Sequence, residues 1–365
     1  NIKMEKSSDQ LNDDLLYIIN TCEHEFNEMS GSNLLITGGA GFLGYYFIQS
    51  ILKWNELRID GNKIKLYILD NFVRGMPSWL GDLKKDNNFD IINQSILDPL
   101  PDNFKDMNFI IHAASIASPI FYRKNPIATM DANVNGLRNI LDACVSSNRK
   151  VKGILYFSTS EIYGDPTNDQ IPTKESYRGN VSCTGPRACY DESKRYGETM
   201  CVTFSQQHNL PIKIARPFNN YGPGLKITDG RALSDFARNI VERKDIVLLS
   251  DGSPTRTFCY VSDAIIGYFK ILVIGRSGES YNIGTETPEI SILELAKKCI
   301  SVGKEVFGYE VGLSFLESSD KNYLADNPNR RCPDISKAKE ELSYAPAISI
   351  EEGLFKSFHW YKNNH

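Results

Sequence analysis

Short apolar runs and longer amphipathic stretches alternate through the first two thirds of the chain. Strands that are covered by helices on both faces are apolar throughout, instead of alternating between apolar and polar side chains. Repeated strand–helix units therefore predict an α/β fold built on a doubly wound parallel sheet. The expected strands of that sheet cover residues 33–37, 65–70, 89–92, 109–112, 153–158 and 212–216.

Helices are expected where apolar residues recur every three or four positions. In the sheet-forming part, the expected helices cover residues 42–54, 126–147 and 190–208. After Pro223 the pattern becomes irregular, which predicts a second, smaller α/β region. Its expected strands lie near 246–249 and 280–283, and its expected helices near 231–243, 262–274, 292–302, 335–342 and 350–361.

The first 32 residues form an N-terminal helical extension ahead of the first expected strand. Residues 1–10 are polar, and we expect them to be disordered. A helix is predicted over 11–29, because its apolar residues step by three or four positions and make one stripe. The stripe packs either on its own chain or against a second copy or partner. It consists of Leu15, Ile19, Cys22, Phe26 and Met29.

Composition excludes several classes of protein. The 365 residues are 41% hydrophobic and 24% charged, with a net charge of −4, which is typical of a soluble globular protein and disfavours nucleic acid as the main partner. The eight cysteines contain no C-x-x-C pair and the five histidines form no cluster, so neither a disulfide scaffold nor a metal site is supported. No apolar run approaches the roughly 20 residues that span a bilayer, and the beginning of the chain has no basic-then-apolar signal pattern. We therefore expect a cytoplasmic protein that binds no membrane.

A glycine-rich turn joins the first expected strand to the following helix. Gly38, Gly41 and Gly44 form G-x-x-G-x-x-G. The first glycines let the backbone approach a pyrophosphate, the last allows close helix–strand packing, and the free N–H groups of the helix N-terminus favour an anion. An isolated motif could be merely a tight turn, but the strand–turn–helix context predicts a dinucleotide site. The residues assigned to the cofactor are Gly38, Gly41, Phe42, Leu43, Asp70, Asn71, Tyr190 and Lys194.

Asp70 ends the second expected strand, 26 residues after Gly44. A carboxylate at this position accepts hydrogen bonds from ribose hydroxyls and repels a 2′-phosphate, which favours NAD over NADP. Arg74 lies nearby and offers the alternative, because its guanidinium could pair with such a phosphate.

Tyr190-Asp-Glu-Ser-Lys194 is the strongest catalytic signal in the chain. Positions i and i+4 share one face of a helix, so the Tyr190 phenol and the Lys194 ammonium can approach a common point. A phenol titrates near pH 10, and a neighbouring cation favours its phenolate. We expect Lys194 to lower the pKa of Tyr190, which then acts as a base. Behind a dinucleotide motif, this spacing is typical of an enzyme that removes a hydroxyl proton while a hydride leaves the same carbon.

Polar residues follow the strand expected at 153–158, where catalytic groups would face the cofactor crevice. They are Thr159, Ser160 and Glu161. Alone, a Ser/Thr run could simply cap a turn. Together with Tyr190 and Lys194, it predicts that Thr159 hydrogen-bonds a sugar hydroxyl and that Glu161 supplies a carboxylate beside it.

From Asn33 to about Asn363 the chain resembles the extended short-chain dehydrogenase/reductase superfamily, which acts on nucleotide sugars. It is similar in particular to the UDP-glucuronate decarboxylase, or UDP-xylose synthase, family. The most specific matching segment is Gly185-Pro-Arg-Ala-Cys-Tyr-Asp-Glu192, and the others are 158–166, 229–231, 256–263 and 331–335. Related dehydratases usually have an acidic aspartate at the position of Ser160, whereas the decarboxylases have serine.

The resemblance implies an NAD-binding Rossmann domain over 33–222, with segments near 255–285 returning to it, and a mainly substrate-binding domain over 223–365. It implies that Tyr190 takes the proton from the hydroxyl on carbon 4 of glucuronate while hydride passes to NAD. Carbon dioxide then leaves the 4-keto sugar, with Tyr190 and Thr159 stabilising the enolate. Glu161 and Arg256 are the candidates for delivering a proton to carbon 5. The bound cofactor finally reduces the ketone. The resemblance also implies a homodimer formed through the helices after Pro126 and from Tyr190.

The substrate so implied carries a diphosphate and a carboxylate, so an acidic protein must concentrate cations locally. Four arginines lie in the matching segments, and their forked donors suit both anions. Each alone would more commonly form a structural ion pair. Together they complete a predicted substrate site of Ser160, Arg187, Asn219, Arg231, Arg256 and Arg331.

Two segments depart from the family. Ser95 stands where the family commonly has an aspartate that reaches the adenine, and Asp98 can replace it only if the loop differs. Tyr177-Arg-Gly replaces the usual Tyr-Trp-Gly. The leading hypothesis is an NAD-dependent UDP-glucuronate decarboxylase. The alternatives are a 4-epimerase or 4,6-dehydratase, and an idle NAD-binding scaffold that uses its N-terminal helix for contact. Ser160 opposes a dehydratase, and the intact pair of Tyr190 and Lys194 opposes a scaffold.

Overall fold

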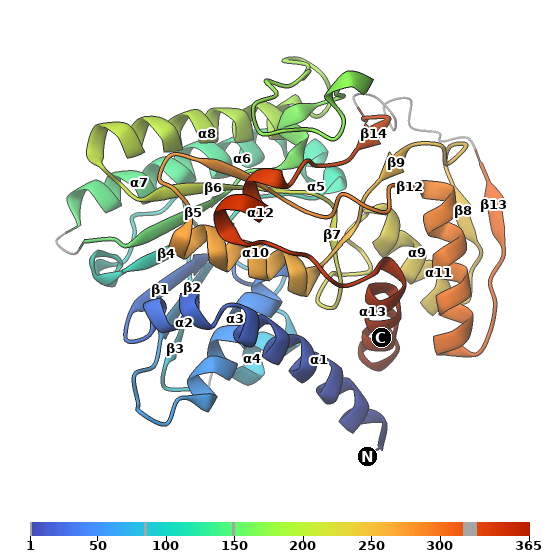
Figure 1. Cartoon of the computed structure of the whole chain (residues 1–365), viewed down its shortest axis with the longest axis horizontal. Helices are drawn as coiled ribbons and strands as arrows, with labels where there is room; N and C mark the ends of the chain where they lie inside the picture. Colours follow the sequence, from blue (N-terminus) through green and yellow to red (C-terminus); the bar gives the residue numbers. More distant parts are fainter. Residues whose placement is uncertain (1, 84–85, 148–149, 317–326) are drawn as a thin grey trace.

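The computed structural model describes residues 2–83, 86–147, 150–316 and 327–365, and the side chains of its first helix from Gln10 onward. Its centre is a seven-stranded sheet in the order β11-β6-β5-β4-β1-β2-β3, in which every neighbouring pair is parallel (Figure 1). This is the doubly wound sheet that the alternating pattern predicts. Its strands are β1 (Asn33–Thr37), β2 (Lys65–Asp70), β3 (Phe89–Asn93), β4 (Phe109–His112), β5 (Gly153–Phe157), β6 (Ile212–Pro217) and β11 (Ser280–Ile283).

Helices cover both faces of the sheet, and each face has its own apolar core. Within β1, Leu34 and Ile36 join one core, whereas Leu35 joins the other. Because both faces are buried, the strands are apolar throughout. The first face is covered by α3 (Phe42–Leu57) and α10 (Val261–Ile274), and the second by α7 (Leu137–Ser146) and α8 (Ala188–His208), as Figure 1 shows. Before α7 the chain forms α5 (Pro119–Lys124), α6 (Pro126–Asp131) and a π-helical turn (Ala132–Gly136), and α4 (Ser78–Asp82) follows β2.

The N-terminal extension is helical from its described beginning, as α1 (Ile2–Thr21) and α2 (Glu23–Met29). The expectation of disorder in residues 1–10 is therefore wrong for the described residues, which continue the helix toward the N-terminus. All five residues of the predicted stripe are buried in the same core as α3 and α10. Of the two alternatives for the stripe, the structure therefore shows packing on its own chain and not against a second copy or partner. Buried Asp14 accepts hydrogen bonds from Tyr46 of α3, Tyr260 and Lys356.

The rest of the chain forms a smaller α/β part at one end of the sheet, on the right of Figure 1. Its described residues form three small sheets, β10-β7, β12-β9-β14 and β13-β8. The strand at 280–283, expected among the irregular elements, joins the main sheet beside β6 as β11. The elements of the smaller part are β7 (Asn220–Tyr221), α9 (Ala232–Val241), β8 (Ile246–Leu248), β9 (Thr255–Arg256), β10 (Cys259–Tyr260), β12 (Ile290–Ser291), α11 (Ile292–Phe307), β13 (Leu313–Phe315), β14 (Arg330–Arg331) and α13 (Ile350–Asn364). Helix α12 (Ser336–Leu342) returns to the sheet part, where it packs on α10 and β11.

A helix must be both long and apolar to cross a membrane. Helix α8 has 21 residues but carries five charged side chains in its first half. Among the described residues, no helix is both long enough and apolar enough to cross a bilayer.

Candidate active site

The glycine-rich turn between β1 and α3 brings the backbone close to its neighbours. A Cβ on Gly38, where φ is +72°, would lie 2.7 Å from the Cα of Ala114. A Cβ on Gly44 would lie 1.9 Å from the carbonyl oxygen of Gly39, so only glycine allows α3 to pack here. Gly41 immediately precedes α3, and Phe42 and Leu43 begin it. This turn presents the N-terminus of α3 to the crevice at the carboxyl ends of the strands, which fits a dinucleotide pyrophosphate.

The Asp70 carboxylate lies beside this turn, at the carboxyl end of β2. One oxygen accepts a hydrogen bond from the N–H of Ala40 at 3.0 Å, and the other accepts from the N–H of Phe72 at 2.8 Å. A carboxylate has about four lone-pair sites, so acceptor capacity remains for ribose hydroxyls. Asn71 follows directly, and its side-chain oxygen accepts from the N–H of Val73. The geometry fits the cofactor role predicted for Asp70.

Arg74, the residue that could have bound a 2′-phosphate, is already paired. Its guanidinium lies 3.3 Å from the carboxylate of Asp229 and 4.1 Å from the centre of the Phe121 ring. The alternative of a free arginine for NADP therefore loses support.

Asp98 folds back onto Ser95. Its carboxylate accepts from the N–H of Ser95 at 3.3 Å, and the Ser95 hydroxyl accepts from the N–H of Leu97. The turn thus places a carboxylate next to the position where the family commonly has aspartate. The adenine contact itself stays a prediction.

Tyr190 and Lys194 lie one turn apart on α8 and are both buried. The Lys194 ammonium lies 5.9 Å from the centre of the Tyr190 ring. It donates a hydrogen bond to the main-chain oxygen of Phe157 at 2.7 Å, which anchors it to the carboxyl end of β5. The predicted helix face therefore brings phenol and ammonium to the strand end, as the spacing indicated.

The pKa of Tyr190 shifts in the direction opposite to the prediction. Burial, together with the charge of Glu161, raises the pKa of Tyr190 to about 12, although Thr159 and Arg231 act to lower it. Burial also lowers the pKa of Lys194 to about 7. The cation therefore does not offset the burial of the phenol in the cofactor-free protein. A positively charged group that binds beside Tyr190 would be needed to favour the phenolate.

Tyr122 is a site residue that the sequence did not indicate. Its ring stacks on that of Tyr190, with centroids 4.9 Å apart and planes 6° apart. Tyr122 is fully buried, and burial raises the pKa of its phenol. It belongs to α5, 68 positions before Tyr190, and no periodic relation connects the two. Only the three-dimensional structure brings them together.

Glu161 lies between two arginines from distant segments. It follows Thr159, whose hydroxyl accepts from the N–H of Glu161 at 3.2 Å. Arg187 donates to one of its carboxylate oxygens, and Arg331 donates to both, at 2.9 Å for one of them. Burial alone would raise the pKa of Glu161, but the two guanidiniums outweigh it and lower the pKa to about 2.

Arg256 approaches this group without contacting Glu161. It lies in β9, directly opposite Arg331 of β14. Its guanidinium donates to the main-chain oxygens of Thr255, Pro328 and Asn329 and to the side chain of Asn327. Burial and the neighbouring Arg331 lower the pKa of Arg256 to about 9. Arg187 and Arg331 therefore pair with Glu161, whereas Arg256, the other candidate for delivering the proton to carbon 5, does not, and its role stays a prediction.

Three predicted substrate residues remain. Arg231 precedes α9 and pairs with Asp229 at 2.8 Å, and its charge acts on Tyr190. Ser160 is buried directly after Thr159. Asn219 has φ +38° and donates to the oxygen of Thr257, so its side chain is engaged within the loop.

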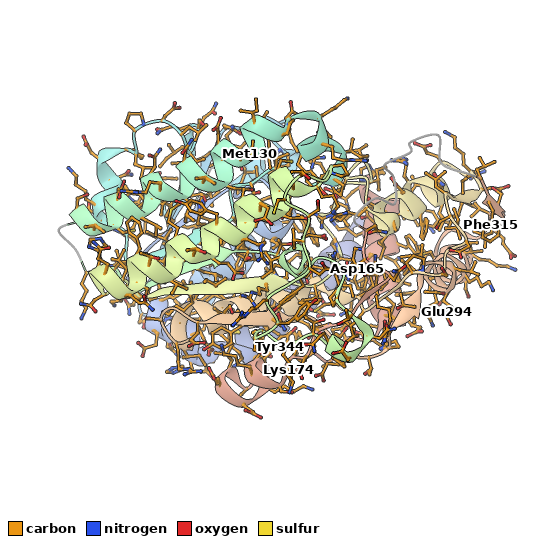
Figure 2. All side chains as sticks on the ribbon, turned by 90° about the horizontal axis from the view of Figure 1, so that it is seen from above. Met130, Asp165, Lys174, Glu294, Phe315 and Tyr344 are labelled. Atoms are coloured by element: carbon orange, nitrogen blue, oxygen red, sulfur yellow. The ribbon has the colours of Figure 1, made fainter. Side chains whose placement is uncertain are left out.

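The site lies where the two parts of the molecule meet. Asp165, a few residues after Glu161, accepts a hydrogen bond from the N–H of Asn329 at 3.0 Å. Figure 2 shows Asp165 between the parts, with Phe315 at the far end of the smaller part. Residues of the sheet part and of the smaller part therefore enclose one common site.

The sheet order, the glycine-rich turn and the Tyr190–Lys194 pair define an extended short-chain dehydrogenase/reductase. A sequence model of the NAD dependent epimerase/dehydratase family matches residues 34–284, and the chain belongs to this family. UDP-glucuronic acid decarboxylase 6 of Arabidopsis thaliana is 37% identical over 329 residues, which cover 89% of this chain and 87% of the relative. UDP-glucuronic acid decarboxylase 1 of Xenopus tropicalis is 34% identical, over 99% of this chain and 82% of the relative.

Solved structures support the same fold. UDP-glucuronic acid 4-epimerase from Bacillus cereus, in complex with UDP-glucuronic acid and NAD, has a TM-score of 0.74 and 26% identity, over 91% of this chain and all of the other. UDP-glucose 4-epimerase from Thermotoga maritima has a TM-score of 0.76 and 23% identity, over 91% of this chain and 99% of the other. The second similarity concerns the fold alone.

Proposed function

We propose that the chain is an NAD-dependent UDP-glucuronate decarboxylase, which forms UDP-xylose through a 4-keto intermediate and reuses its bound cofactor. The observation that carries the proposal is the Glu161 carboxylate, held between Arg187 and Arg331 next to Tyr190. A substrate carboxylate can be bound there by the same guanidiniums. The names of the relatives that align over most of the chain support this reaction.

The glycine-rich turn would hold the cofactor pyrophosphate through Gly38, Gly41, Phe42 and Leu43. Asp70 and Asn71 would bind the adjoining ribose, and Tyr190 and Lys194 the nicotinamide side. When bound, NAD supplies the oxidation of carbon 4 and its later reduction. The family description and the geometry of the turn support this assignment.

Tyr190 takes the proton from the hydroxyl on carbon 4, while Thr159 orients that hydroxyl. The pKa of Tyr190 is about 12 without ligands, so the base form needs a stabilising cation. Lys194 stabilises the phenolate when its own amino group is protonated. The stack on Tyr122 fixes the ring so that its oxygen points in one direction. After loss of carbon dioxide, Tyr190 and Thr159 donate hydrogen bonds to the enolate oxygen.

Glu161 delivers the proton to carbon 5. In the free protein its pKa is about 2, so it holds no proton at neutral pH. A substrate carboxylate that binds Arg331 competes with Glu161 for that arginine, which raises the pKa of Glu161 and lets it carry a proton. Arg256 adds a further cation, which favours binding of the substrate carboxylate. Arg187, Arg231, Asn219 and Ser160 complete the contacts to the nucleotide sugar.

A panel of nucleotide sugars tests the proposal. UDP-glucuronate should yield one carbon dioxide and one UDP-pentose per turnover, detected by gas trapping and mass spectrometry. A 4-epimerase would return an isomer of unchanged mass, and a 4,6-dehydratase would release water from a UDP-hexose. Either of these products, formed without carbon dioxide, would contradict the decarboxylase assignment and support the corresponding alternative.

We propose a homodimer that pairs through α6, α7 and α8, and a cytoplasmic location. Ile127 and Met130 of α6 and Tyr196 of α8 are exposed, with 70%, 40% and 54% of their surfaces accessible. Figure 2 shows Met130 on the outer side of the molecule. Exposed apolar side chains on packed neighbouring helices support a dimer surface. The eight free cysteines fit a reducing compartment.

A further inference from the structure

A segment of irregular backbone borders the cofactor crevice. Residues 222–231, which we call the strap, connect β7 to α9. A Cβ on Gly224 would lie 2.9 Å from the Tyr45 side chain of α3, and a Cβ on Gly230 would lie 2.4 Å from the Ile120 side chain of α5. Helix α3 follows β1 and the glycine-rich turn, and α5 follows β4, the neighbour of β1 in the sheet. The strap therefore contacts helices that follow two neighbouring strands of the sheet.

The loop after β2 contacts the strap at two points. Lys226 of the strap donates to the main-chain oxygen of Arg74 at 2.9 Å, and the Arg74 guanidinium pairs with Asp229 at 3.3 Å. We call Arg74, Lys226 and Asp229 the clasp. Burial and Arg74 lower the pKa of Lys226, whereas Asp70 and Asp229 oppose this, so Lys226 lies close to the predicted ribose ligand as well. The clasp thus joins the ribose side of the crevice to the strap.

The strap side of the clasp is firmly held. The main-chain oxygen of Asp229 accepts from the Ser118 hydroxyl at 2.5 Å, and its carboxylate also pairs with Arg231. Only 8% of the Asp229 side chain is exposed, compared with 34% for Arg74. Separation of the pair would leave a nearly buried carboxylate with one cation fewer, which is unfavourable. Arg74 is therefore the more exposed and less constrained partner of the pair.

We propose that the clasp retains the cofactor during turnover, by preventing the loop after β2 from moving away from the strap. The inference rests on the proposed function, because a recycling enzyme must keep its reduced cofactor until the ketone has been reduced. Arg74 then acts as a positioning residue, through Asp229, and needs no contact with the sugar. Its side chain is also oriented by the Phe121 ring beneath it.

Arg74→Ala tests the clasp. Bound NADH is diluted into excess NAD without any sugar nucleotide, and its release is followed by fluorescence. Loss of the ion pair should speed release roughly tenfold, which corresponds to about 1.4 kcal/mol. Arg74→Lys, which keeps the charge, should restore most of the retention. During turnover of UDP-glucuronate, Arg74→Ala should release more free NADH and 4-keto sugar per UDP-xylose.

Arg138→Ala is the matched control, because Arg138 forms an exposed ion pair with Asp142 on α7. Its NADH release should equal that of the wild type. Should Arg74→Ala fail to fold by circular dichroism, Arg74→Gln provides the same neutral test with a longer side chain. Release within twofold of wild type in the folded neutral variant overturns the inference. A wild-type protein that forms no carbon dioxide would count against the proposed function instead, and would leave the release measurement valid.

Discussion

At the scale of single residues, Tyr190 and Glu161 are set apart by their surroundings. Burial keeps Tyr190 protonated in the free protein, whereas two arginines keep Glu161 ionised. Tyr190 must be deprotonated to accept the proton of the hydroxyl, and Glu161 must be protonated to deliver one to carbon 5. Each therefore starts in the protonation state opposite to the one that its proposed step requires. Binding of a cationic cofactor would lower the pKa of Tyr190, and binding of an anionic substrate would raise the pKa of Glu161.

Replacement of Tyr190 by phenylalanine should abolish most turnover, because only the proton acceptor is removed. We expect kcat to fall by about 10³ or more, within the range of general acid–base catalysis or beyond it. The stack on Tyr122 needs the ring alone, so NAD affinity should stay within a few fold of wild type. Rates are measured with UDP-glucuronate, and affinity by calorimetry. A variant with near-normal kcat would remove Tyr190 from the mechanism.

Glu161→Gln should lower kcat by about 10² or more, because the amide cannot deliver a proton. The variant would accumulate NADH with the sugar oxidised, observable at 340 nm. Glu192→Gln, an exposed change on α8, serves as control and should leave kcat unchanged. An unchanged rate in Glu161→Gln would make this carboxylate a structural partner of the arginines.

Lys194 predicts a pH dependence of stability. Its pKa is about 7 when folded and about 10.4 when unfolded, so the unfolded chain binds more protons between these values. The contribution of Lys194 to the free energy of unfolding should therefore rise as pH increases from 7 to 9, whereas buried cysteines, whose pKa values are raised by burial, contribute in the opposite direction. The free energy of unfolding of Lys194→Met should therefore increase less with pH than that of the wild type. Both proteins keep the contribution of buried Lys213, whose pKa is lowered to about 8. Urea unfolding at several pH values measures this, and identical slopes would contradict it.

At the scale of elements, strands and helices with clear periodicity could be predicted closely. The strand at 109–112 has the bounds that its apolar run indicates, and α8 begins two residues before its predicted start. Strands β7, β9, β10, β12 and β14 could not be found, because two residues carry no periodic pattern. Their pairing depends on distant segments: β9 binds β12 and β14, which brings Arg331 opposite Arg256.

The same limit applies to the site. Its local motifs, namely the glycine-rich turn and Tyr190 with Lys194, could be read because spacing along one element determines their geometry. The Glu161–Arg331 pair joins residues 170 positions apart, and the Tyr122 stack joins two separate helices. Sequence spacing contains no information on such contacts. The sequence assigned Glu161 and Arg331 to one site without their pairing, and it gave no indication of Tyr122.

Asp14 tests the contribution of the N-terminal helix. Its buried carboxylate accepts from Tyr46 and Tyr260 and pairs with Lys356 at 2.9 Å. Asp14→Ala leaves these donors without their acceptor, so we expect a loss of about 3 kcal/mol in the free energy of unfolding. Asp13→Ala, an exposed neighbour, should change it by less than about 0.5 kcal/mol. Equal values for the two variants in urea unfolding would show that α1 contributes little through this group.

At the scale of the whole molecule, the sheet part supplies the phenol and the carboxylate, and the smaller part supplies Arg256 and Arg331. The two sets meet because Asp165 and the segment after Pro328 hold the parts together. The Asp14 network connects α3, β10 and α13 on the other side of the molecule. The geometry of the site therefore depends on both parts, and an isolated sheet part would lack three of the four predicted substrate arginines, namely Arg231, Arg256 and Arg331.

The central claim is that one site oxidises carbon 4, releases carbon dioxide and returns the same hydrogen to carbon 4. The most direct test is turnover of UDP-glucuronate in D2O, with the product examined by proton NMR and mass spectrometry. The account predicts UDP-xylose with one deuterium at carbon 5 and the original hydrogen at carbon 4. Deuterium at carbon 4, or a six-carbon product without deuterium at carbon 5, would contradict it.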